Sequence, residues 1–175
     1  MNFWMAWLND RTGIVSFWQT YRQRTAPLRC RTLASWPSVI VFLFFLEAVT
    51  GLVLWMYYSP SAQTAWESVY YLQYEVLGGG LLRALHYYGG QVLLGVSGIY
   101  VLHLLYRWAY RAPREVVFWL AVLLVPVTLG VLLTGDLLAW SQRGYWSTNV
   151  RTNFLLLIPA IGDGLRRLAI GGPEL

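Results

Sequence analysis

The sequence predicts an all-α membrane protein with an N-terminal interfacial helix, three transmembrane helices and short helices at the opposite surface. Hydrophobic residues make up 57% of the 175 residues and charged residues only 12%, and the mean hydropathy is +0.47. This composition is typical of a chain solvated by lipid rather than by water. We expect an interfacial segment over residues 1–34, followed by one transmembrane domain over 35–175.

Three apolar stretches each approach the length of about twenty residues that a helix needs to cross a bilayer. They cover residues 36–58, 85–108 and 116–133. Pro60 closes the first stretch, and Pro113 separates the second from the third, as expected of residues that break helices. The sequence therefore predicts three spans, A, B and C.

The segments outside these spans are amphipathic. Residues 2–24 mix Trp and Phe with polar side chains, which indicates a helix lying in the membrane interface. A signal peptide is the alternative, but Asp10 and Arg11 interrupt the apolar run and no small-residue cleavage site follows. Residues 136–175 mix Trp140 and Trp146 with polar groups, which predicts short helices at the outer interface rather than a fourth span.

The arginines indicate the topology. They gather in the segments before span A and at 107–114, whereas residues 59–82 contain no basic residue. Under the positive-inside rule, the N-terminus and the 107–114 loop face the cytoplasm. We therefore explain the net charge of +5 by membrane topology, not by nucleic acid, and expect an integral protein of the bacterial inner membrane.

A series of short motifs gives the chain its resemblance to a known family. The chain resembles the N-terminal half of cytochrome b, the haem subunit of quinol:cytochrome c and quinol:plastocyanin oxidoreductases, over about residues 35–172. The motifs that carry the resemblance are Thr50-Gly51, Tyr58-Ser59-Pro60, Ala65 to Ser68, Glu75-Val76, Arg83-x-x-His86, Pro113-Arg114-Glu115, Thr134-Gly135 and Trp140-x-Gln142-x-x-Tyr145-Trp146.

The resemblance implies a four-helix haem bundle in which helices B and D each supply two histidines to two b haems. Such complexes oxidise quinol near the outer face with the help of an iron-sulfur subunit and pass electrons to a c-type cytochrome. The sequence ends near the position where helix D of the family would begin. We therefore expect a partner chain to supply the helix D histidines.

At the outer end of the bundle the family's pattern is intact. His86 matches the axial ligand of the outer haem and Arg83 the basic residue that meets its propionate. Gly51 and Gly135 match glycines that make room for the porphyrin. These four residues are the expected outer haem site, with His86 as the metal ligand. The alternative is that His86 is only a hydrogen-bonding residue between helices.

At the inner end the pattern is altered. A step of fourteen residues returns to within about 40° of the same helix face, and there, at the family's second ligand position, the chain has Tyr100. Pro37 and Ala121 replace glycines and would narrow the porphyrin slot. We expect one outer b haem and the loss of the usual inner site, with Tyr100 a neutral hydrogen-bonding residue rather than a tyrosinate ligand.

His103 stands where the family has Arg, and it is seventeen residues beyond His86. This places it about 100° around the helix from the face of His86. Two interpretations stay open: a hydrogen-bonded histidine near the cytoplasmic end, or a metal ligand of a displaced inner haem if a π-bulge rotates the helix.

Three further residues are unusual. Glu47, deep in span A, replaces a common Gln and is a site candidate, because an acid inside a membrane is costly. Asp136 replaces an aromatic residue beside the expected quinol pocket, where it could transfer protons or simply be solvated. Cys30 lies about five residues too early for the haem-tethering cysteine of the chloroplast-type branch, so we expect an ordinary thiol.

Two hypotheses follow. The chain could be the haem-binding part of a split cytochrome b that passes electrons between quinol and a redox partner. Alternatively, it could be a haem-poor membrane anchor, derived from cytochrome b, that organises a larger respiratory or photosynthetic complex. Either way it is not a complete enzyme by itself. The sequence contains no paired nucleophile and base. Gly78-Gly79-Gly80 lacks the flanking strand and Lys of a phosphate loop, and we expect it to be a flexible turn that leads into span B.

Overall fold

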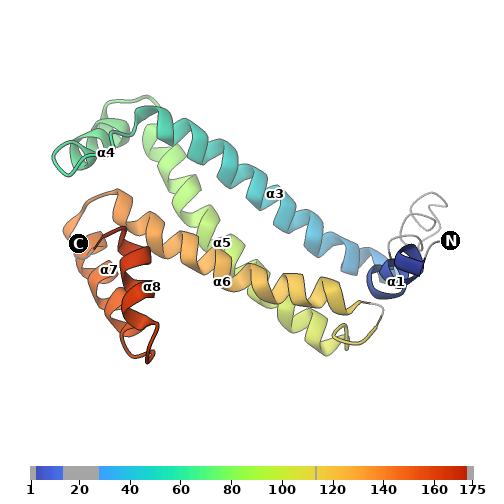
Figure 1. Ribbon diagram of the computed structural model, residues 1–175. Helices are drawn as coiled ribbons and strands as arrows, with labels where there is room; N and C mark the ends of the chain where they lie inside the picture. The colour runs from blue at the N-terminus through green and yellow to red at the C-terminus, as the bar shows by residue number, and fades with distance from the viewer. Residues whose placement is uncertain (1–2, 14–27, 113, 173–175) are drawn as a thin grey trace. The chain divides into compact units, whose positions relative to one another are not determined.

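Every regular secondary-structure element in the part of the chain that the structure describes is a helix. The structure is a computed structural model that describes residues 3–13, 28–112 and 114–172 (Figure 1). In these ranges the helices are α1 (Phe3–Thr12), α3 (Leu28–Tyr57), α4 (Ala65–Tyr74), α5 (Gly79–Tyr106), α6 (Glu115–Leu138), α7 (Gln142–Leu155) and α8 (Gly162–Ile170).

Three helices are long and apolar enough to cross a membrane. The spans are Ser35–Tyr57 within α3, Gly79–Tyr106, which is all of α5, and Glu115–Leu138, which is all of α6. This confirms the predicted all-α membrane fold and its three spans. The short helices α7 and α8 follow the third span, as predicted.

The predicted boundaries differ from the observed ones by more than two residues at two places. Span B begins six residues earlier than predicted, because Gly79 and Gly80 belong to α5 and only Gly78, at φ 77°, has the left-handed backbone of a turn. The expectation of a flexible three-glycine turn was therefore wrong. Span C continues five residues beyond Leu133, to Leu138, and within it the Thr134 hydroxyl donates to the carbonyls of Gly130 and Val131 in its own helix.

The N-terminal segment was expected to lie in the interface over residues 1–34. In the structure α1 covers residues 3–12, and α3 begins at Leu28, so the helix is continuous across position 34. Residues 14–27 lie outside the described part of the chain. Trp4 and Trp7 are exposed on α1.

The chain divides into two compact units, and each unit contains part of the long helices α3, α5 and α6. The first unit contains residues Met1–Glu47 and Gly89–Thr128. Its core is apolar and is built from α3, α5, α6 and the loop between the last two. The buried residues of this core are Ile40, Leu43, Leu93, Tyr100, Leu104, Ala109, Phe118 and Ala121.

An ion pair joins distant parts of the first unit. The Arg11 guanidinium near the end of α1 donates to the Glu115 carboxylate in the first turn of α6. A carboxylate in the first turn of a helix also interacts favourably with the helix dipole. The contact therefore fixes the end of α1 to the beginning of α6.

The second unit contains residues Ala48–Tyr88 and Leu129–Leu175. It holds the remainders of the three span helices together with α4, α7 and α8, and α7 packs against α8. The Tyr58 hydroxyl donates to the Leu138 carbonyl at 2.8 Å, linking the end of α3 to the end of α6. Burial raises the pKa of the Tyr58 phenol, so this group remains a neutral donor at physiological pH.

Close backbone packing fixes the start of α7. The Ser141 hydroxyl caps this helix by accepting from the Gly144 amide at 3.2 Å. A Cβ atom at Gly144 would lie 2.5 Å from the Asp136 carbonyl oxygen. Because that contact is to backbone, only glycine fits at this position.

Candidate functional site

His86 lies on α5 with its ring held by α3. The Thr50 hydroxyl and His86 Nδ1 are 2.9 Å apart, and Thr50 is only 4% exposed. In the tautomer in which Nδ1 donates this hydrogen bond, Nε2 carries the lone pair that can coordinate a metal. The geometry therefore suits an imidazole oriented for coordination through Nε2.

Gly51 lets α3 approach the same imidazole closely. A Cβ atom at Gly51 would lie 3.0 Å from His86 Cε1, tighter than ordinary van der Waals contact. A larger residue would displace the ring. Gly51 and His86, both expected at the outer site, are thus brought together, and Thr50 joins them.

Arg83 lies one turn before His86 on α5. It donates from Nη1 to Gln73 Oε1 of α4 at 2.9 Å. A guanidinium has five N–H donors, so this bond fixes the side chain and leaves donor capacity for an anionic group. The structure thus shows how Arg83 is anchored, and a contact with a propionate stays a prediction.

Gly135 lies on the exposed side of α6. A Cβ atom there would meet nothing within 4 Å, so open space adjoins this part of the helix. The neighbouring Asp136 accepts from Arg151 of α7 at 2.6 Å. Asp136 is therefore paired rather than merely solvated.

Tyr100, at the inner end, is part of the buried core. It is 7% exposed and belongs to the same cluster as Ile40, Leu93 and Ala121. Ala121 is buried as well. The position at which a second ligand was expected is thus occupied by a phenol side chain packed in the apolar core of the first unit.

His103 keeps the rotation predicted from its spacing, because α5 is a regular α-helix from Gly79 to Tyr106 without a π-bulge. Its ring lies beside Trp36 of α3, with the ring centroids 6.0 Å apart. Its Nε2 atom is buried, and the described part of the chain offers that atom no hydrogen-bond partner. Burying such a polar atom costs about 1–3 kcal/mol unless something satisfies it.

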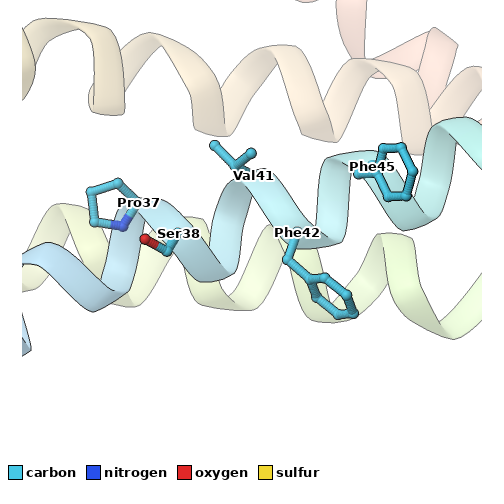
Figure 2. A pocket seen from close by; sticks show the side chains of 5 residues that line it. All are labelled: Pro37, Ser38, Val41, Phe42 and Phe45. Carbon is cyan, nitrogen blue, oxygen red and sulfur yellow. The ribbon is translucent and has the colours of Figure 1, made fainter.

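Pro37, expected beside the inner porphyrin slot, is exposed on α3. Figure 2 shows it with the four other side chains of a shallow, mostly apolar groove of about 520 Å³. All five lining residues belong to α3: Pro37, Ser38, Val41, Phe42 and Phe45. Pro37 therefore lies on a surface of the helix, in contrast to Ala121 in the core.

Glu47 lies against a glycine of the neighbouring helix. A Cβ atom at Gly89 of α5 would overlap the Glu47 Oε1 atom. Glu47 itself is half-buried. Gly89 thus makes room for the carboxyl group inside span A. Cys30 lies in α3, and its side chain is outside the described structure.

The donor set of the site limits the kind of metal centre that fits. Within residues 3–13, 28–112 and 114–172, no three His, Cys, Asp or Glu side chains gather to hold a metal ion. A single oriented imidazole instead suits a metal that brings its own equatorial ligands, as haem iron does. The Thr50, Gly51 and His86 geometry fits that requirement.

Sequence reasoning missed several supporting residues. It identified His86, Gly51 and Arg83, but not the roles of Thr50 and Gln73 as their hydrogen-bond partners. It also missed Arg151, which pairs with Asp136. Thr50 stands beside Gly51 in the motif, and that adjacency was the one available signal.

Comparison with known proteins supports the resemblance. The family described as cytochrome b/b6/petB matches residues 24–174. The chain is 29% identical over 97% of its length to the menaquinol:cytochrome c reductase cytochrome b subunit of Geobacillus thermodenitrificans, covering 79% of that protein. It is 31% identical over 95% of its length to cytochrome b of Cereibacter sphaeroides, but covers only 38% of it.

A solved structure agrees with these relatives. A chain of a hyperthermophilic respiratory Complex III matches with a TM-score of 0.69 and 27% identity, covering 79% of this chain and 38% of that one. The chain therefore spans well under half of the longer proteins that it resembles. These similarities and the three apolar helices show that the chain is an integral membrane protein of the cytochrome b family.

Proposed function

We propose that this chain binds one b haem through His86 and acts as an electron-transfer subunit of a quinol-oxidising membrane complex. The observation that carries the proposal is the hydrogen bond of 2.9 Å between Thr50 and His86 Nδ1, with Gly51 closing against the same ring. A haem b held there supplies reversible one-electron transfer.

The residues of the chain orient the ligand and balance charge. Thr50 holds the imidazole so that Nε2 is the coordinating nitrogen. Arg83, anchored by Gln73, supplies positive charge one turn from His86 for a propionate carboxylate. Gly135, with open space beside it, leaves room for the porphyrin edge.

A partner polypeptide completes the haem site in this proposal. The chain contains two histidines, and His103 lies about 100° around α5 from His86. We therefore propose that the second axial ligand of the His86 haem comes from a helix outside these 175 residues, supplied by a partner chain. We further propose a c-type cytochrome or iron-sulfur subunit as redox partner, quinol as substrate, and a cytoplasmic N-terminus in a bacterial inner membrane.

His103 supports a second candidate. Its buried Nε2 atom has no hydrogen-bond partner in the described structure, which favours a ligand on that atom. A second haem bound through His103 would lie on a different face of α5 from the first.

Haem counting in the purified native complex tests both candidates. We expect one b haem per chain in a pyridine haemochrome assay, lost in His86→Ala and kept in His103→Ala. Two haems, with one lost in each variant, would favour the second candidate. A wild-type complex without b haem would contradict the proposal and leave a membrane anchor.

A further inference from the structure

α4 carries an exposed aromatic face that the haem site does not use. The face consists of Trp66, Tyr70, Tyr71 and Tyr74, whose side chains are 53%, 48%, 54% and 69% exposed. Three of them form a ladder along the helix. Trp66 stacks on Tyr70 with centroids 5.4 Å apart, and Tyr70 contacts Tyr74 at 4.7 Å.

The opposite side of α4 already has its packing partners. Ala65 and Leu72 are buried at 3% and 4% exposure. Residues seven apart return to nearly the same side of a helix. Ala65 and Leu72 therefore mark the side of α4 that packs against the rest of the protein. The aromatic face is therefore the outward side of α4.

An acidic residue lies within this aromatic face. Glu67 is exposed, and it precedes Tyr70 by three residues and Tyr71 by four, the spacings of side-chain neighbours on a helix. The whole segment from Ser59 to Leu82 contains Glu67 and Glu75 but no basic residue. The face is thus aromatic and negatively charged.

This chemistry suits a basic protein surface better than a lipid surface. Exposed Tyr and Trp also occur at membrane interfaces, but helices that lie on membranes generally carry Lys and Arg to meet anionic headgroups, and this segment has none. Tyr and Trp are enriched in protein interfaces, where they dominate binding energy. Aromatic rings beside a carboxylate also attract Arg and Lys through cation–π contacts and ion pairing.

We propose that the α4 aromatic face docks a partner protein that presents Arg or Lys side chains to Glu67 and the tyrosines. The family relatives include cytochrome b subunits of multi-subunit reductases, so a neighbouring subunit is available to fill this role. The inference does not depend on haem binding by His86.

Photocrosslinking in native membranes tests the proposal with the full-length chain. Tyr71 is replaced by p-benzoylphenylalanine, and the irradiated products are identified by mass spectrometry. We expect a crosslink to a polypeptide segment that contains Arg or Lys. Adducts to phospholipid alone would overturn the proposal.

Charge variants make the test specific. Glu67→Arg is expected to lower the yield of the protein crosslink about tenfold, the effect of losing one interfacial charge contact. Asp163→Arg is the matched control, because it makes the same charge change at an exposed acid of another helix, α8 (Gly162–Ile170), and we expect its crosslink yield to equal that of the wild type.

Glu67→Gln guards against misfolding of the reversed-charge variant. For this variant we expect the yield of the protein crosslink to fall by only about threefold. The amount of the chain in the membrane should equal that of the wild type. Equal yields for the wild type, Glu67→Gln and Glu67→Arg would show that charge recognition plays no part, and would refute the proposal.

Discussion

Replacing Thr50 by Val tests whether the hydrogen bond to His86 prepares the imidazole for coordination. Valine keeps the shape of threonine but removes the hydroxyl, so Nδ1 of the half-buried His86 loses this contact of 2.9 Å. A buried polar atom left without a partner costs about 1–3 kcal/mol. Loss of such a supporting contact typically weakens metal binding by about 10- to 100-fold.

The assay is a titration of the haem-depleted complex with hemin, followed by absorbance. We expect Thr50→Val to weaken binding by about tenfold or more, and Thr50→Ser, which keeps the hydroxyl, to bind nearly as the wild type does. Thr134→Val is the matched control, because the Thr134 hydroxyl bonds only carbonyls of its own helix in the structure.

Wild-type affinity in Thr50→Val, with normal folding of that variant, would refute the reasoning. It would mean that the Nδ1 contact neither selects the tautomer nor holds the ring. His86→Ala in the same titration sets the baseline for complete loss of the ligand.

Three other substitutions test the geometry. Gly51→Ala should weaken hemin binding about tenfold in the same titration, because its Cβ would lie 3.0 Å from the imidazole; unchanged binding would contradict close packing there. Gly144→Ala should lower the thermal stability of the detergent-solubilised complex by about 1–3 kcal/mol, because its Cβ would meet a carbonyl at 2.5 Å. Gly164→Ala is the control, because a Cβ atom at Gly164 would meet nothing within 4 Å, and we expect this variant to keep the stability of the wild type. Arg151→Ala should change stability in that assay by less than about 1 kcal/mol, because its pair with Asp136 is over a third exposed on both sides; a larger loss would show a coupled network.

The spans could be predicted because length and hydropathy alone determine whether a helix can cross a bilayer. Span A was predicted to within one residue of the observed Ser35–Tyr57. The start of α5 was harder, because glycine usually disfavours helix. There Gly79 is helical, and its lack of a side chain lets it pack against the Leu72 carbonyl.

The site could be predicted only in part. The motif pointed to His86 and Gly51, but the partner of Nδ1 depends on how α3 and α5 are rotated about their axes, which sequence spacing within one helix does not determine. The same holds for Arg83, whose partner Gln73 lies in α4, and for His103, whose neighbour Trp36 lies in α3.

The ion pair between Arg11 and Glu115 has a consequence for biogenesis. The two residues are 104 positions apart in the chain, so the contact cannot form until Glu115 has been synthesised. At that stage the first two spans have already left the ribosome's peptidyl-transferase centre. The helix that is synthesised first therefore cannot be joined to α6 by this ion pair until synthesis of the third span has begun.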